Sequence, residues 1–346
     1  MKALQISGRG PIFLGDGFLT EEGAFKESPF PDELSEFTRV ALVTDSRLAG
    51  RYLYPVLGFF RARGLKVFSC SFEGGEELQD ESTVSFLHAF FDRCGLTSAD
   101  AVAALGGCSV QNLVGYAASV YCTGLPFVSL PTTPASLLFP FPGGRAYRRR
   151  QGQESFLSVP LCPLVSLCDT SFFATLPSES ERVGLALSAG VAVTSSISLT
   201  EKLSEGITVT EAAREAVSAL AARRVPESAV SDFHTGAPIE WEFGHLCASL
   251  LRKRLPPSEA LALGMLTEAE AACRKGLCAP GFPEELKERL SSLGFSAIKS
   301  EESLSGVPSL FERLAGNPLA VPGKSRLFWP EALGKGRWVY YEPSLF

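Results

Sequence analysis

The stretch that decides the fold reads GGCSVQNLVGYAASVYCTGLPFVSLPTTP and runs from Gly106 to Pro134. It follows the apolar run Ala101 to Leu105, and a second apolar run, Phe127 to Leu130, lies near its end. This order predicts a buried strand, a glycine turn, a helix from about Asn112 and another buried strand. A glycine turn before a helix lets a phosphate approach bare backbone and the helix N-terminus. The stretch therefore predicts a nucleotide-binding type of α/β unit.

The same alternation of strands and helices extends toward the N-terminus. The elements expected there are strands at Val40–Thr44 and Lys66–Phe72 and helices at Arg51–Arg63 and Ser82–Cys94. Such alternation predicts a parallel sheet with helices on both faces, and the ligands of such sheets bind beyond the carboxyl ends of the strands. Asp45 and the pair Gly106-Gly107 both fall at such strand ends.

The character of the sequence changes after Asp169. From Glu179 onward the apolar residues recur with helical spacing, and β-branched runs are scarce. The helices expected in this half are Glu179–Leu203, Thr210–Arg223, Ile239–Arg254, Ser258–Lys275, Pro283–Leu293 and Glu301–Ala315. We therefore expect an α/β domain with a Rossmann-like parallel sheet at residues 1–172, followed by an all-helical domain at residues 173–346.

Composition argues against a nucleic-acid-binding protein. The 346 residues are 45% hydrophobic, which is enough to fill two cores, and the net charge of −6 leaves no broad basic face for nucleic acid. The local cluster of Arg145, Arg148, Arg149 and Arg150 is typical of a solvated basic loop, with a phosphate site as the alternative.

Cysteine usage and the apolar segments bear on the compartment. The nine cysteines form no C-x-x-C pair, and the closest two, Cys273 and Cys278, match no common zinc signature. Scattered cysteines favour a reducing compartment. The N-terminus lacks the long apolar segment of a signal peptide, and the run Val183–Thr200 contains glycines, serines and threonines that favour a buried helix over a membrane span. We therefore expect a cytoplasmic protein that does not cross a membrane.

Three blocks of sequence, in order, carry a family resemblance. The first is the Gly106–Pro134 stretch, the second is CDTSFFATLPSESERVGLA at Cys168–Ala186, and the third is FGHLCAS followed by SEALALGM within Phe243–Met265. Together they resemble the dehydroquinate synthase family of sugar-phosphate cyclases. The resemblance implies a nicotinamide-binding α/β domain, a helical metal-binding domain and a homodimer.

The resemblance also implies a reaction. In active members of that family, NAD transiently oxidises an alcohol of the substrate, phosphate is eliminated, the ketone is reduced, and the ring closes. A zinc or similar divalent ion, held by a Glu and two His, polarises the hydroxyl and ketone oxygens. The ligands implied for this chain are therefore NAD, a divalent metal and a sugar phosphate.

The positions that match the family's three metal ligands carry other residues here. Leu187 stands in place of the Glu, Pro257 in place of one His, and Trp241 in place of a His four residues before His245 on the same helix face. None of these side chains binds a divalent cation, so the sequence predicts no metal site at these positions. His245 itself matches a further family histidine and is the residual candidate for proton transfer.

Most groups that match the family's polar substrate contacts are also replaced. Thr123 stands for an Arg, Phe139 for an Asp, and Gly190 for a Lys. Arg145 stands for a Lys and keeps the positive charge, so it is the remaining candidate for contact with a substrate.

The cofactor side of the pattern is partly kept. The candidate cofactor-binding residues are Asp45 for the ribose hydroxyls, Gly106 and Gly107 for close approach of a pyrophosphate, and Thr132 and Thr133 as hydroxyl donors. Cys108 replaces a third glycine and adds a Cβ where the pyrophosphate would pass, and Gln111-Asn112 replaces Gly-Asp. We therefore expect weakened NAD binding.

Two functions remain open from the sequence. The first is a degenerate family member that has lost the cyclase chemistry and acts in binding, regulation or assembly. The second is an active, divergent dehydroquinate synthase or related NAD-dependent enzyme with a relocated site. Glu242 and His245 have a Glu-x-x-His spacing that occurs in real metal sites, and Glu240, His234 and Glu259 are further candidate ligands. The alternative for His245 is a role in packing.

Overall fold

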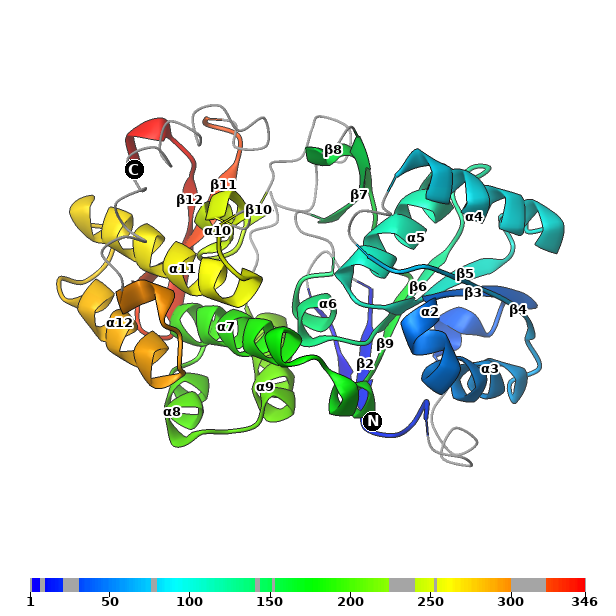
Figure 1. The fold of residues 1–346 in the computed structure, drawn as a ribbon, viewed down its shortest axis with the longest axis horizontal. Helices are drawn as coiled ribbons and strands as arrows, with labels where there is room; N and C mark the ends of the chain where they lie inside the picture. Colours follow the sequence, from blue (N-terminus) through cyan, green and yellow to red (C-terminus); the bar gives the residue numbers. More distant parts are fainter. Residues whose placement is uncertain are drawn as a thin grey trace. The chain divides into compact units, whose positions relative to one another are not determined.

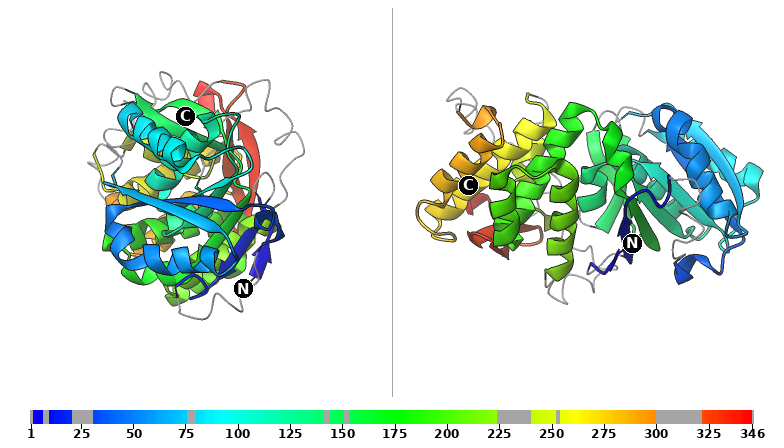
Figure 2. Two further views of the ribbon diagram at one scale, coloured as in Figure 1. Left: turned by 90° about the vertical axis from the view of Figure 1, so that its right-hand side faces the viewer. Right: turned by 90° about the horizontal axis from the view of Figure 1, so that it is seen from below.

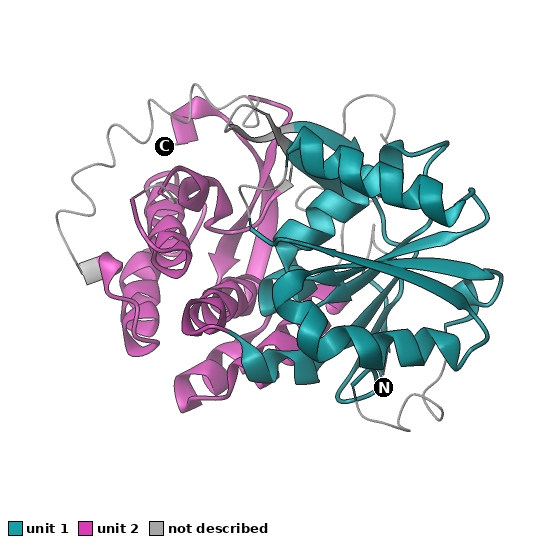
Figure 3. Ribbon diagram, turned by 45° about the vertical axis from the view of Figure 1, so that its right-hand side comes forward, with its two compact units in different colours: residues 1–176 teal, residues 177–346 magenta. Residues whose placement is uncertain are grey.

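The computed structural model describes residues 2–6, 10–20, 31–75, 80–140, 144–150, 153–223, 240–251, 254–299 and 322–345. Two compact units divide the chain, residues 1–176 and residues 177–346, and each is described by itself (Figure 3). The first unit is built on a mostly parallel sheet with helices, and the second is predominantly helical, as expected from the sequence.

Seven strands form the main sheet of the described part of the first unit, in the order β1-β2-β9-β6-β5-β3-β4 (Figure 1). They are β1 Lys2–Leu4, β2 Ile12–Gly15, β3 Arg39–Asp45, β4 Lys66–Phe72, β5 Ala101–Gly106, β6 Phe127–Pro131 and β9 Val165–Asp169. β1 pairs with β2 in antiparallel orientation, and the other neighbours pair in parallel. The three strands expected before Gly106 are confirmed. The continuous apolar runs of β3 and β5 suit strands that are covered on both faces, whereas β4 lies at the edge of the sheet and is partly exposed.

Helices cover both faces of this sheet. They are α2 Ser46–Leu48, α3 Tyr54–Arg61, α4 Glu81–Cys94, α5 Cys108–Val120 and α6 Pro134–Leu138. Helices α4 and α5 lie over one face, whereas α3 lies over the other (Figures 1 and 2). The helix expected from about Asn112 begins four residues earlier, because Gly107 takes an extended conformation and serves as the N-cap of α5.

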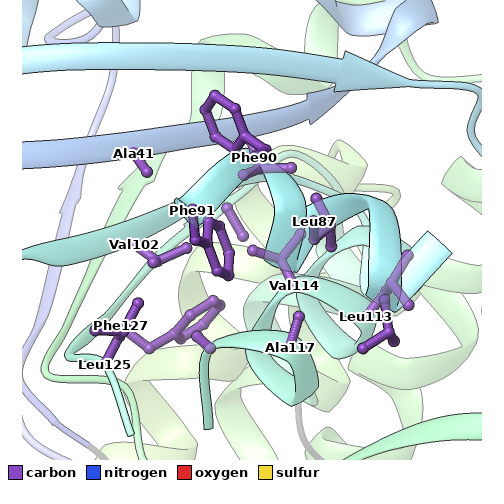
Figure 4. Packing of buried hydrophobic residues seen from close by; sticks show 14 of the residues in the cluster. Ala41, Leu87, Phe90, Phe91, Val102, Leu113, Val114, Ala117, Leu125 and Phe127 are labelled. Carbon is purple, nitrogen blue, oxygen red and sulfur yellow. The ribbon is translucent and has the colours of Figure 1, made fainter. Parts of the chain in front are cut away.

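The core of the first unit lies between α4, α5 and the sheet (Figure 4). Leu87 and Phe91 of α4 meet Val114 of α5 and the strand residues Val102 and Phe127. Burial of these side chains stabilises the unit by roughly 2 kcal/mol for each large residue.

His88 of α4 lies beside this core. Its Nε2 is 3.0 Å from the carbonyl oxygen of Ala117 on α5. This hydrogen bond joins two packed helices, which gives this histidine a structural role.

The basic cluster after residue 144 forms a strand, so the expectation of a solvated loop is wrong. β7 Arg145–Arg150 pairs with β8 Gln153–Pro160 in an antiparallel hairpin. Arg145 donates from Nε to the hydroxyl of Ser158 at 2.8 Å and from a terminal nitrogen to the Ser158 carbonyl at 3.1 Å. Arg148 pairs with Glu81 of α4 at 3.1 Å. The backbone pairing and these side-chain contacts hold the segment against the unit.

The second unit consists of helices with a small sheet. Its helices are α7 Ser178–Ser195, α8 Ile197–Glu205, α9 Val209–Ala222, α10 His245–Leu251, α11 Pro257–Arg274 and α12 Phe282–Ser292. β10 Glu240–Trp241, β11 Arg326–Ala332 and β12 Lys335–Tyr340 form a three-stranded sheet, which the expectation of an all-helical domain did not include. Within the described ranges, no helix is long and apolar enough to cross a membrane.

Two of the expected helices differ from those in the structure. The single helix at Glu179–Leu203 is divided at Ser196, whose extended backbone ends α7 and whose hydroxyl accepts the Leu199 N–H to begin α8. The helix expected at Ile239–Arg254 begins only at His245, because Gly244 has a φ of +83° and β10 precedes it. The helix expected at Glu301–Ala315 lies outside the described residues.

Candidate functional site

The candidate cofactor-binding residues lie at one edge of the first unit's sheet. Asp45 is the last residue of β3 and Gly106 is the last residue of β5, whereas Thr132 and Thr133 directly follow β6. Since β3, β5 and β6 are neighbours and run in parallel, their carboxyl ends meet at the same edge. The structure therefore brings these residues together with Gly107, the N-cap of α5.

The two glycines of the turn are needed for different reasons. A Cβ on Gly106 would lie 2.5 Å from Cβ of Val110, so the packing of α5 on β5 already requires a glycine there. A Cβ on Gly107 would lie 3.3 Å from Cγ2 of Thr133, at the end of a side chain that can turn away. Packing therefore explains Gly106, whereas Gly107 is the better candidate for close approach of a ligand.

Gly106→Ala is expected to destabilise the first unit by about 2 kcal/mol, because the new methyl group overlaps the Val110 side chain. Urea unfolding followed by circular dichroism measures this change. Gly50→Ala is the matched control, since nothing lies within 4 Å of a Cβ at Gly50. An equal midpoint for both variants would contradict the packing argument.

One carboxylate oxygen of Asp45 already caps a helix. Its Oδ1 accepts the N–H groups of Arg47 at 2.9 Å and Leu48 at 3.0 Å, and so caps α2. Its Oδ2 lies 3.3 Å from a guanidinium nitrogen of Arg47, a side chain that is 71% exposed. Since an ionised carboxylate oxygen accepts more than one hydrogen bond, Oδ2 keeps capacity for a ribose hydroxyl.

The two threonines after β6 differ in their hydrogen bonds. The hydroxyl of Thr133 accepts the Ser136 N–H at 3.2 Å and caps α6. The hydroxyl of Thr132 makes no hydrogen bond with any residue in the described part of the chain. Thr132 is buried, and of the two threonines it is the one whose hydroxyl does not already cap a helix.

Gln111 and Asn112, which replace Gly-Asp of the family pattern, serve the fold. Buried Gln111 donates to the Ala104 carbonyl at 2.8 Å and accepts the Ser129 hydroxyl at 3.0 Å. Asn112 donates to the carbonyls of Cys108 at 2.9 Å and Pro140 at 3.1 Å. Both amides are bound to neighbouring backbone, so they fasten α5 to β5 and to the chain after α6.

The second unit places the three ligand-matching residues on three elements. Leu187 is buried on α7, Trp241 lies on β10, and Pro257 is the first residue of α11. The expectation that Trp241 and His245 share a helix face is wrong. Trp241 pairs with Leu327 of β11, and the left-handed Gly244 turns the chain before α10 begins at His245.

The acids that the sequence offered for a relocated metal site are held by arginines. Both carboxylate oxygens of Glu242 accept from Arg223, at 2.9 Å and 2.8 Å, and this guanidinium lies 3.8 Å from the centre of the Phe328 ring. Glu259 pairs with Arg182 and also accepts the Ala297 N–H at 2.7 Å. The side chains of Glu240 and His234 lie outside the described residues.

Arg223→Ala is expected to cost about 2 kcal/mol of unfolding free energy, because it leaves the Glu242 carboxylate, which is 20% exposed, without its partner. Chemical denaturation measures this loss. Lys202→Ala is the matched control, since it breaks an exposed pair with Glu215 that should contribute less than about 1 kcal/mol. Equal losses in the two variants would contradict the structural role of the Arg223–Glu242 pair.

A buried carboxylate that the sequence analysis missed lies beneath the turn before His245. Glu268 of α11 is fully buried, and it accepts N–H groups from Gly244 at 2.9 Å, Cys247 at 3.2 Å and the Trp329 indole at 3.0 Å. Burial raises the pKa of Glu268 to about 7, although these hydrogen bonds oppose the shift. The signal was present in the sequence, because Glu268 follows Leu261 and Met265 at helical spacing on the apolar face of α11.

Comparison with known proteins finds similarity to one family. The family model for the 3-dehydroquinate synthase N-terminal region matches residues 69–182. The 3-dehydroquinate synthase of Streptococcus sanguinis is 26% identical over 294 residues, which cover 82% of this chain and 81% of the relative. The chain is therefore similar to the dehydroquinate synthase family at low identity. Another relative, the 3-dehydroquinate synthase of Geobacter metallireducens, is 28% identical over 172 residues, or 50% of this chain and 46% of that protein.

Solved structures share the dehydroquinate synthase-like fold over nearly the whole chain. A 2-deoxy-scyllo-inosose synthase, complexed with carbaglucose-6-phosphate, NAD+ and Co2+, has a TM-score of 0.74 at 17% identity and covers 99% of this chain and 97% of its own. The 2-epi-5-epi-valiolone synthase of Streptomyces hygroscopicus, with NAD+ and Zn2+ bound, has a TM-score of 0.73 at 17% identity and covers 99% and 96%.

The residues that the resemblance places at the three ligand positions, Leu187, Trp241 and Pro257, do not fit a divalent cation. Leucine and proline offer no ligand, and the Trp241 indole nitrogen is a hydrogen-bond donor that cannot coordinate a metal. In the described ranges this nitrogen is buried without an acceptor, and no group of three or more His, Cys, Asp or Glu side chains is arranged to hold a metal ion.

Proposed function

We propose that this chain is a dehydroquinate synthase-family protein that has lost the metal-dependent cyclase chemistry and binds a nucleotide weakly at the edge of its sheet. The observation that carries the proposal is the set Leu187, Trp241 and Pro257 at the ligand-matching positions, next to acids that are already paired with arginines. In this view the protein acts through binding, regulation or assembly.

The chemical argument concerns charge. Cyclisation requires a cation to polarise hydroxyl and ketone oxygens, and a metal needs several anionic or imidazole ligands that are free to approach it. Glu242 and Glu259 satisfy their charge with Arg223 and Arg182, so recruiting either acid would leave a guanidinium uncompensated. His245 alone is too few ligands for a zinc site.

The residues at the sheet edge still fit a dinucleotide. The Gly107 backbone and the first-turn N–H groups of α5 would hold a pyrophosphate, Asp45 would accept a ribose hydroxyl, and the Thr132 hydroxyl would supply a further contact. Cys108 lies in that first turn, and its side chain would narrow the space through which a pyrophosphate reaches the backbone N–H groups. We therefore expect weak binding of NAD. NAD, when bound, supplies a hydride acceptor, and these residues only bind and orient it.

Metal analysis together with nucleotide titration tests the proposal. We expect purified protein dialysed against zinc to hold no stoichiometric metal, to bind NAD weakly by calorimetry, and to release no phosphate from the sugar-phosphate substrate of dehydroquinate synthase. Stoichiometric zinc that is lost in the His245→Ala variant would overturn the loss of the metal site. Absence of binding at millimolar NAD would overturn the retained nucleotide site.

Gly107→Ala is expected to weaken NAD binding by about tenfold, which corresponds to about 1.4 kcal/mol, with little change in stability. The new methyl group would block the backbone where a pyrophosphate approaches, and among the described residues it meets only the Thr133 side chain. Calorimetric titration and urea unfolding of the same preparation separate the two effects. Unchanged affinity in this variant would place the nucleotide elsewhere.

A second candidate function is an active, divergent cyclase or NAD-dependent enzyme with a relocated site. It is favoured by His245, which stands at the first residue of α10 on a turn anchored by Glu268. This candidate predicts phosphate release or NAD reduction that is lost in His245→Ala. Full turnover in that variant would rule out a role for the histidine.

We also propose that the protein is a homodimer, as the family resemblance implies. Sedimentation analysis of the purified chain measures this directly. A monomer at micromolar concentration would contradict the proposal.

A further inference from the structure

Two cysteines lie together at the C-terminal end of α11. Cys273 is in the last turn of the helix and is partly exposed, whereas Cys278 follows the helix and is buried. Cys273 contributes to the raised pKa of the Cys278 thiol. Among the nine free cysteines, these are the closest pair in the sequence.

The turn after α11 folds the chain back onto the helix. The Gly276 N–H bonds to the Cys273 carbonyl at 2.9 Å, and the Leu277 N–H bonds to the Ala272 carbonyl at 2.8 Å. Gly276 has a φ of +64°, which an L-residue rarely adopts, so glycine permits this reversal. Cys278 therefore returns alongside the final turns of α11.

An independent contact places the buried thiol on the face that carries Cys273. Sγ of Cys278 donates to the carbonyl oxygen of Ala269 at 3.7 Å. Ala269 and Cys273 are four residues apart, so they lie one above the other on a helix face. The Cys278 thiol, which contacts the Ala269 carbonyl, therefore lies next to Cys273 on the same face of α11.

We propose that Cys273 and Cys278 are a redox-sensitive pair that a peroxide oxidises to an intramolecular disulfide. Cys273, which solvent reaches, acts first, and Cys278 resolves the product. Burial raises the pKa of Cys278 to about 11, so this sulfur remains protonated at neutral pH and is protected until Cys273 has reacted. In a reducing compartment such a pair is typical of a transient redox response.

The chemistry needs only one molecule of hydrogen peroxide. The Cys273 thiolate attacks one peroxide oxygen, the O–O bond breaks, and the departing hydroxide takes a proton to become water, which leaves a sulfenic acid on Cys273. The Cys278 sulfur then attacks the Cys273 sulfur, the S–O bond breaks, and the leaving hydroxide takes the Cys278 proton to form a second water. Each sulfur loses one electron, and the peroxide gains two.

Peptide mapping tests the pair. Native protein is treated with equimolar hydrogen peroxide, its remaining thiols are alkylated, and it is digested with trypsin without reduction. Trypsin cleaves after Arg274 and Lys275, between the two cysteines, so a disulfide joins two peptides that otherwise separate. We expect this joined species, with the loss of two hydrogen atoms, and a reductant should restore both thiols.

Two cysteine variants test the order of the steps, and a second cysteine pair serves as the control. Cys278→Ser should leave a sulfenic acid on Cys273 that dimedone traps, and Cys273→Ser should show neither product. Cys70 of β4 packs against the core cluster that contains Cys94 of α4. These two cysteines belong to separate elements and are not joined by a short turn, so they serve as the internal comparison. Recovery of Cys273 and Cys278 as separately alkylated peptides, or joining of Cys70 to Cys94 at an equal rate, would overturn the proposal.

Discussion

Replacing Gly244 by alanine is expected to destabilise the second unit by about 4 kcal/mol, from a left-handed backbone and overpacking combined. Gly244 has a φ of +83°, and a Cβ there would lie 2.4 Å from Cγ and 2.8 Å from the backbone nitrogen of Met265. The backbone atom belongs to α11 and cannot move without moving that helix. The same substitution would displace the Gly244 N–H from the Glu268 carboxylate.

Guanidinium chloride unfolding measures the loss, and a matched glycine isolates its cause. Gly206 has a φ of +87°, and no atom of the described residues lies within 4 Å of a Cβ placed on it. Gly206→Ala should therefore lower the unfolding free energy by about 1 kcal/mol, because only the left-handed backbone is unfavourable for alanine there. If the two variants lost the same stability, the contact with Met265 would not be the reason for the glycine at position 244.

Gly244 also explains why the sequence misplaced the helix around it. The apolar residues from Ile239 to Arg254 have helical spacing, and periodicity alone does not show that one glycine inside the run has a left-handed backbone. By contrast, the run Ala101–Leu105 was predicted correctly as a strand. A short, continuous apolar run followed by glycines is typical of a strand buried on both faces.

For the candidate site too, the sequence placed some residues correctly and misled about others. The sheet-edge residues Asp45 and Gly107 could be placed from the sequence, because strand ends of a parallel sheet share one edge. The Glu242–His245 spacing was misleading, because the partner that holds Glu242 is Arg223, 19 residues earlier on another element. Local spacing carries no information about such a partner. The prediction of lost metal ligands from Leu187, Trp241 and Pro257 rests on residue type alone, and the metal analysis proposed above tests it.

The stability of the protein is expected to fall as pH rises from about 4.5 to about 7, through the titration of Glu268. Burial raises the pKa of this carboxyl from its ordinary value of 4.5 to about 7 in the folded protein. Between these values the folded state holds the proton and the unfolded state does not, so folding binds a proton and is favoured by lower pH. The contribution of Glu268 is fully present below the unfolded pKa and is lost once pH exceeds the folded pKa.

The size of this effect follows from the pKa difference. At about 1.4 kcal/mol for each pKa unit, the loss across this range is about 3 kcal/mol. Among the described residues, the groups that contact the Glu268 carboxylate are the N–H and thiol of Cys247, the Trp329 indole and the Gly244 N–H, and none of them carries a compensating positive charge. The ionised carboxylate is therefore stabilised only by hydrogen bonds.

Glu268→Gln should remove this dependence, because the amide does not titrate. The difference in unfolding free energy between the variant and the original protein, measured by urea denaturation at intervals from pH 4.5 to pH 8, should move in favour of the variant by about 3 kcal/mol. Subtraction at each pH cancels the titration of all other groups. Glu201→Gln, at an exposed position of α8, makes the same change of charge and should give a difference that stays flat. A flat difference for Glu268→Gln as well would mean that the buried carboxyl titrates in the same range in the folded and unfolded chains.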